Sequence, residues 1–356
     1  MSSLIHEFNL KRLINTMATL TPVQRRWRRF KSNRRGYYSL WIFALLFTFS
    51  LFAEGWSNDK PLLIYYEGHY YVPLLYTYPE TTFGGDFDTE ADYQDAFIKE
   101  KLTAKNNWVW YAPNPYSYNT IQYDHAQPNP APPSRENLLG TDDRGRDVLA
   151  RLIYGFRLSV LFGLMLTAIG TIIGILAGAL QGYFGGKFDL LFQRFIEIWG
   201  SMPELYLLII FASMFQPNLL LLLILLSLFG WIGLADYVRA EFLRGRNMDY
   251  VKAARALGVP NLKIMWRHLL PNAMTPVITF LPFRMSGSIL ALTSLDYLGL
   301  GLPPSYPSLG ELLAQSKANI TAWWLFLSTF TVLVGMLILL IFIGEALREA
   351  FDPHKG

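Results

Sequence analysis

The chain has 356 residues, of which 52% are hydrophobic and only 16% charged, with a formal net charge of +4 and no cysteine. The absence of cysteine excludes a disulfide, a thiolate metal site and a cysteine nucleophile. Low charge, together with several apolar runs near the ~20 residues that span a hydrocarbon core, predicts a polytopic membrane protein. The modest positive charge carries topology information and indicates no nucleic-acid partner.

Segment 1–36 is polar and basic, with nine Lys or Arg against a single acid, Glu7. The apolar run that follows comes too late for a secretory signal peptide and lacks an Ala-x-Ala exit, so residues 37–54 are predicted to form an uncleaved first transmembrane helix. The positive-inside rule places segment 1–36 in the cytoplasm. A DNA-binding arm is the alternative, disfavoured because the arginines adjoin a membrane helix.

Residues 55–137 are expected to form a soluble insert after the first helix. The segment is acidic and aromatic, and its alternating tyrosines predict short strands. Alternating acids between Asp86 and Asp92 resemble a calcium loop only superficially, because Ala91 and Phe97 stand where an EF-hand needs Gly and Glu. A solvated acidic loop is therefore expected, and no metal site is predicted.

The stretch from Asn137 to Leu149, NLLGTDDRGRDVL, is expected to form a surface or re-entrant helix that leads into the second span. That span is predicted over Val160–Gly182. Its glycines recur every four residues and so share one helical face, which permits close approach of another helix. These residues are Gly170, Gly174, Gly178 and Gly182.

The sequence contains no nucleotide-binding, metal-binding or catalytic motif that we recognise. Gly185-Gly186-Lys187 resembles the end of a phosphate loop, but Gln181 and Phe188 occupy the places where a Walker motif needs Gly and Ser or Thr. The five histidines are scattered and none is paired at ligand spacing. We therefore predict no catalytic residues, no metal site and no ATPase activity in this chain.

A break is predicted at Gly200–Glu204. Ser201 and Glu204 have capping-box spacing and Pro203 stands in the first turn, so one helix stops and another begins. Broken helices at membrane depth are tolerated where they line protein or a water-filled path. Pro203 is therefore a candidate translocation-path residue. A further span is expected over Leu219–Ala235.

A polar, basic stretch, Tyr250–Asn272, separates two apolar runs. From Arg239 to His268 the chain carries seven Lys or Arg against two acids, which places this loop in the cytoplasm. Its alanines predict a short helix that stops at Gly258. A small-residue helix permits close contact with another protein, and the alternative is an ordinary loop that binds lipid headgroups.

The fifth span is predicted from Met274 to about Leu295, with Arg284 near its middle. A charge there costs on the order of 3 kcal/mol on insertion scales, so Arg284 should face protein or water and is a candidate translocation-path residue. The sixth span is expected from Trp323 to about Ile343. Residues 347–356 would form a cytoplasmic tail.

The basic loop resembles the EAA loop of ABC-importer permeases: Glu-Ala-Ala, three residues, Gly, nine residues, Ile-x-Leu-Pro. Lys252 replaces the Glu and His268 the Ile. Three further stretches, LLGTDDRGRDVLARLIYGFRLS, LGLGLPPSYPSLGELL and GEALREAFDP, are similar to signatures of the second permease subunit of the dipeptide/oligopeptide/nickel group. The long aromatic insert resembles that of a peptide-importer permease that also admits the antibiotic microcin C. The ATPase-coupling residues carried over are Lys252, Ala253, Ala254, Gly258, Leu270 and Pro271.

The resemblance implies an all-α membrane protein with six transmembrane helices, a type I (MetI-like) permease core over 138–346 with its EAA loop at 245–272, and a periplasmic insert. It implies ATP-driven import of oligopeptides or peptide-like compounds across a Gram-negative inner membrane, with both termini cytoplasmic. Expected partners are a second permease in a heterodimer, two ATPase subunits or one fused ATPase that bind ATP and Mg, a periplasmic binding protein and lipid. The alternatives are an ion-coupled secondary transporter and an ABC importer of nickel or another small solute.

Overall fold

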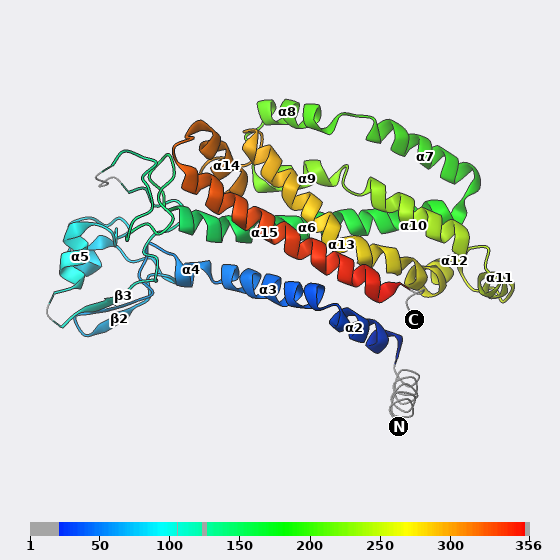
Figure 1. The fold of residues 1–356 in the computed structure, drawn as a ribbon, viewed down its shortest axis with the longest axis horizontal. Coiled ribbons are helices and arrows are strands. Elements are labelled where there is room, and N and C mark those ends of the chain that lie inside the picture. Colours follow the sequence, from blue (N-terminus) through cyan, green and yellow to red (C-terminus); the bar gives the residue numbers. More distant parts are fainter. Residues whose placement is uncertain (1–20, 105, 123–126, 353–356) are drawn as a thin grey trace, which may run out of the picture.

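The computed structural model describes residues 21–352 except 105 and 123–126. Long helices lie side by side along one axis, and a small unit with strands lies beyond one end of them (Figure 1). We call that end the insert end. The opposite end, where the short helices α11 (Asp249–Ala256) and α12 (Asn261–Ile264) lie, is called the loop end.

The first described helices run from the loop end to the insert end: α2 (Pro22–Ser32), α3 (Arg34–Leu51) and α4 (Ala53–Trp56). Helix α3 lies along the last helix, α15 (Trp323–Phe351). The two helices are so close at Gly36 that a Cβ added there would lie 2.1 Å from the Cβ of Ala346. Phe30 packs into the same contact, so segments from the two ends of the chain are joined.

The insert contains a three-stranded antiparallel sheet in the order β2-β1-β3, built from β1 (Leu63–Tyr66), β2 (His69–Tyr71) and β3 (Trp108–Trp110). The prediction of short strands from the alternating tyrosines is confirmed. Ile64 and Tyr66 point inward onto Phe83 of the 3-10 helix η1 (Glu80–Phe83) and onto α5 (Ala96–Leu102). The insert thus has a hydrophobic core of its own.

From Val148 onward the chain is mostly helical. In chain order its elements are α6 (Val148–Phe184), α7 (Gly186–Gly200), α8 (Glu204–Met214), α9 (Leu219–Ser227), α10 (Ile232–Gly245), α11, α12, the π-helical turn η2 (Met265–Leu269), α13 (Leu270–Tyr297), α14 (Leu309–Ala318) and α15. The predicted surface helix at 137–149 is wrong. That segment makes turns, and the helix begins at Val148 because the Asp147 carboxylate caps it by accepting from Ala150 N at 2.7 Å.

Four helical stretches in the described residues are long and apolar enough to cross a membrane: 148–184, 219–245, 261–297 and 323–351. The pair α7 and α8, bent by 63° at the predicted break, would make a fifth. Helix α3, the predicted first span, is not among them, because Arg34, Arg35 and two tyrosines lower its mean hydropathy. The fold is therefore a mostly helical membrane protein with four or five such stretches.

The glycine face of α6 packs against α10. A Cβ on Gly178 would lie 2.3 Å from the carbonyl oxygen of Ala235, and one on Gly182 would lie 2.5 Å from that of Arg239. Backbone therefore touches backbone along this contact, as small residues allow in membrane helices. The predicted close approach at the glycine face is confirmed.

Gly178→Ala is expected to lower the free energy of unfolding by about 1–3 kcal/mol, because an added methyl group in a filled contact forces the two helices apart. Gly233→Ala, the same change on α10, meets no heavy atom of the described residues within 4 Å and should be neutral or slightly stabilising. Thermal unfolding of both variants in detergent measures the difference. Equal melting temperatures would contradict the role assigned to the glycine face.

Candidate functional site

The loop-end helix α11 ends in a glycine-dependent cap. Gly258 has a φ of +74°, the left-handed region that disfavours other residues. Its N–H donates to Arg255 O at 2.9 Å, and Val259 N donates to Ala254 O at 3.1 Å. These two bonds form a Schellman motif, so the predicted helix stop at Gly258 is confirmed.

One face of this loop is fixed to the helix bundle. Ala254 and Val251 are buried against residues of α10 and α12. The Tyr183 hydroxyl, near the end of α6, donates to Asn261 Oδ1 at 2.7 Å, and the Arg255 guanidinium lies 5.0 Å from the centre of the Tyr183 ring. Sequence reasoning missed Tyr183, which only the fold brings to the loop. Helices α11 and α12 are therefore both attached to the end of α6 through Tyr183.

The opposite face of the loop is exposed and partly apolar. Leu257 is 83% exposed, Leu262 66% and Trp266 59%. Lys252 and Ala253 lie on this exposed side, and Lys252 pairs with Asp249 at 3.4 Å. Such a group of large exposed apolar side chains on a small basic loop indicates a surface that contacts either another protein or the membrane.

Leu270 and Pro271 begin α13 and are less prominent in this surface. Leu270 is half-buried against the core at the loop end, and Pro271 is exposed in the first turn. The helix is continuous from Asn261 and passes through the π-helical turn η2 directly before Leu270, so Pro271 lies inside it and removes one helical N–H. The two residues therefore lie at an irregular turn within the 261–297 helix and not at its start.

Arg284 lies midway along α13 and lines a cavity of about 270 Å³. Its Nη2 donates to Gly230 O at 2.8 Å, at the break between α9 and α10, while its buried Nε has no acceptor in the described part of the chain. The guanidinium fits because residue 170 is glycine: a Cβ there would lie 2.7 Å from Nη2.

Pro203 and Glu204 are neighbours at the bend between α7 and α8, but their surroundings differ. Pro203 precedes α8, is exposed and does not line the Arg284 cavity, whereas Glu204 does. The predicted capping box is wrong, because the Ser201 hydroxyl donates to Ile198 O at 2.7 Å and α8 has no side-chain cap. Because Glu204 was interpreted as a helix cap, the sequence analysis did not propose it as a cavity residue. An acidic residue within an apolar run could have indicated that role.

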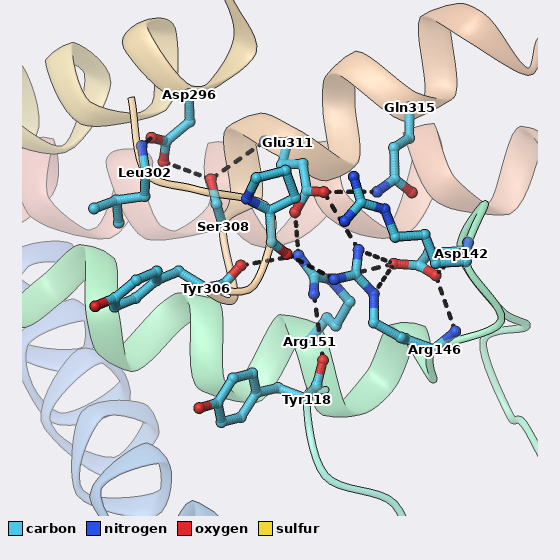
Figure 2. Close-up of polar contacts among 12 residues, drawn as sticks. Tyr118, Asp142, Arg146, Arg151, Asp296, Leu302, Tyr306, Ser308, Glu311 and Gln315 are labelled. Carbon is cyan, nitrogen blue, oxygen red and sulfur yellow. Dashed lines mark hydrogen bonds and ion pairs between the residues drawn. The ribbon is translucent and has the colours of Figure 1, made fainter. Parts of the chain in front are cut away.

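A buried ion network closes the insert end of the bundle (Figure 2). Arg146 Nη2 lies 2.6 Å from Asp142 Oδ2 and 3.3 Å from Glu311 Oε1. Arg151, which is 0% exposed, lies 3.5 Å from Asp142 and pairs with Glu311 on α14. Arg151 also donates to Tyr306 O at 3.0 Å. The network joins the turn before α6 to the segment between α13 and α15.

Two carboxyl groups beside this network, those of Asp143 and Asp147, have raised pKa values. Burial, and next the neighbouring Asp142 charge, raise the pKa of Asp143 above its usual range. Burial also raises the pKa of Asp147, although the amides of Asn137 and Asn114 donate to its carboxylate at 2.8 and 2.9 Å. Both shifts follow from removal of the carboxylates from water.

A bundle of apolar helices with a fixed basic loop and no nucleotide motif is typical of a transporter's membrane subunit. The chain belongs to the family "Binding-protein-dependent transport system inner membrane component", which matches residues 170–356. The family "N-terminal TM domain of oligopeptide transport permease C" matches residues 21–84. The chain is thus a multi-pass inner-membrane permease of an ABC system, in which partner ATPases bind ATP and a binding protein takes part.

Two curated relatives match nearly the whole chain, and a third matches two thirds of it. "Inner membrane ABC transporter permease protein YejE" of Escherichia coli (strain K12) is 56% identical, covering 96% of this chain and 100% of the relative. "Peptidoglycan transport system permease protein YejE" of Agrobacterium fabrum is 52% identical, covering 93% of each. "Oligopeptide transport system permease protein OppC" of Haemophilus influenzae is 35% identical, covering 67% of this chain and 77% of the relative.

Among solved structures, an inward-facing MetNI methionine ABC transporter chain is similar, with a TM-score of 0.48 and 19% identity. The similarity covers 57% of this chain and 97% of that chain.

Proposed function

We propose that this chain is the second (C-type) permease subunit of an importer for oligopeptides or peptide-like compounds and that it forms a heterodimer with a different permease. The observation that carries the proposal is similarity over much or nearly all of the chain to permeases named for oligopeptide and peptidoglycan transport. Microcin C remains a predicted cargo. Nickel is the alternative cargo, but none of these relatives is named for it.

The proposed topology has six spans, with α3 as the first and the bent α7–α8 pair as the third. The match of an N-terminal TM domain to residues 21–84, which include α3, supports the first span. The basic residues of segments 1–36 and 245–272 favour a cytoplasmic loop end, with both termini there and the tail at 347–356. Residues 55–137 would then be a periplasmic insert, and 138–346 the permease core.

We further propose that α11 docks on the ATPase. When the two ATPase domains close, α11 would transmit that movement to the helix bundle. Two observations support this role. Leu257 and Leu262 are exposed, and the Tyr183 hydroxyl holds the loop to α6 by its hydrogen bond with Asn261. In this proposal Lys252, Ala253, Ala254 and Gly258 form the docking helix, and Leu270 and Pro271 connect it to α13. Because Lys252 stands where the family pattern has an acid, its contact on the ATPase is expected to be acidic.

Arg284 and the bend at Pro203 are proposed to belong to the translocation path. Arg284 lines a cavity at mid-span, and Pro203 stands at the 63° bend between α7 and α8. A charge at that depth is tolerated where it faces protein or water, which is the environment of a transport path.

Co-purification after mild solubilisation tests the assignment most directly. We expect the tagged chain to bring with it a second permease and two ATPase subunits or one fused ATPase, and the reconstituted complex to import peptide only with ATP and binding protein. A secondary transporter would instead be recovered alone and would respond to an ion gradient. Uptake by the lone chain would refute the proposal.

A further inference from the structure

The Arg284 cavity holds a second, opposite charge that is not neutralised. Among the described residues that line it, Glu204 and Arg284 are the charged ones, and the others are apolar, glycine or serine. Neither a hydrogen bond nor an ion pair joins Glu204 to another described residue. The two charges therefore line one cavity without pairing with each other.

Arg284 retains donors that face no acceptor among the described residues. A guanidinium has five N–H donors, and here one bond, from Nη2 to Gly230 O, fixes its position. The unpaired Nε is itself closed to a ligand, so the N–H groups left to bind one are those on Nη1 and the second one on Nη2. A planar guanidinium with free donors is suited to bind a carboxylate through two parallel hydrogen bonds.

Isolated opposite charges within an apolar bundle are costly unless a partner reaches them. Glu204 begins α8 directly after the 63° bend, and Arg284 is held from α9–α10 through Gly230, so the two charges come from separate parts of the bundle. A ligand that carries a cation at one end and an anion at the other would neutralise both. A short peptide with free termini has this charge pattern.

We propose that Glu204 and Arg284 form a two-point site for zwitterionic short peptides, in which Glu204 binds the free ammonium group and Arg284 the free carboxylate. The inference rests on the proposed peptide import and adds the site and the cargo's charge pattern. The cavity, at about 270 Å³, is smaller than the 300–1,000 Å³ typical of pockets for drug-sized ligands, so it fits a di- or tripeptide.

The test uses the complete transporter, with its second permease, ATPases and binding protein, in proteoliposomes. ATP-driven uptake of one tripeptide is measured with free termini, with an acetylated N-terminus and with an amidated C-terminus. Glu204→Gln should reduce uptake of the free peptide about tenfold relative to wild type, yet leave uptake of the acetylated peptide unchanged. Arg284→Gln should do the same with respect to the amidated peptide.

The controls separate this site from other effects. The same binding protein serves every reaction, so its own preference cancels between permease variants. Glu197→Gln alters an exposed ion pair with Arg194 on α7 and should change none of the three rates. Glu204→Asp and Arg284→Lys keep the charges and should retain most of the discrimination, which identifies a charge requirement and not a folding defect.

Two results would overturn the inference: equal loss of all three peptides in both Gln variants while Glu204→Asp and Arg284→Lys restore nothing, or wild-type rates throughout. In either case ATP-dependent import by the wild-type complex would leave the proposed function standing. Absence of import by the wild-type complex would instead refute the proposed function itself.

Discussion

Arg151→Leu is expected to lower the free energy of unfolding by about 3–5 kcal/mol, the range found when one partner of a buried ion pair is removed. Arg151 is fully buried and contacts both Asp142 and Glu311 (Figure 2). Without it, Arg146 alone must balance two carboxylates, and the backbone carbonyl of Tyr306 loses its donor. Thermal unfolding in detergent, and the yield of folded protein, measure the effect.

Arg144→Leu is the matched control. Arg144 lies seven positions earlier in the same motif, but its side chain is 48% exposed and its contact with Asp143 is 3.9 Å long. Exposed pairs contribute about 0–1 kcal/mol, so the control should melt near wild type. If the two leucine variants melted at the same temperature, the buried ion network would not contribute more to the free energy of unfolding than an exposed ion pair does.

Gly258→Val is expected to uncouple ATP hydrolysis from transport. An L-residue in the left-handed region costs roughly 1–2 kcal/mol, and a β-branched one costs more, so the Schellman cap would open and α11 would change its direction. No heavy atom of the described residues lies within 4 Å of the added Cβ, so the effect arises from the backbone and not from a clash. We expect peptide uptake to fall at least tenfold while the assembled complex still hydrolyses ATP.

Gly258→Asn separates backbone strain from added bulk. Asparagine is similar in size to valine but tolerates a positive φ, so this variant should keep uptake close to wild type. Uptake and ATPase activity are measured in parallel on the same reconstituted complexes. Normal uptake by the valine variant would count against the coupling role of the loop, and equal loss in both variants would point to contact with the ATPase surface.

Local patterns predicted the features that depend on neighbours in the chain. The glycines of α6 recur every four residues, so their shared face follows from helix geometry alone. The stop at Gly258 follows because glycine adopts a positive φ at little cost. The strands at Leu63–Tyr66 and His69–Tyr71 follow from their enrichment in tyrosine and isoleucine, which favour strands.

Other features required the fold. Spacing suggested that Glu204 caps its own helix, but the 63° bend between α7 and α8 turns it toward the Arg284 cavity. Local sequence predicted a surface helix at residues 137–149, whereas Asp142 and Arg146 are withdrawn from solvent into an ion network. The apolar run predicted a first span over residues 37–54, whereas helix α3 begins at Arg34 and is not among the four long apolar stretches.

By itself the sequence determined the class of protein, the spans with the highest hydropathy, the glycine contact face and the loop helix, because each depends on periodicity or on one residue's backbone preference. The tertiary structure alone decided which charges meet. Arg151 and Glu311 are 160 positions apart, and Glu204 and Arg284 come from different helices. The free energy of a buried charge depends on its partners in space, which no local spacing records.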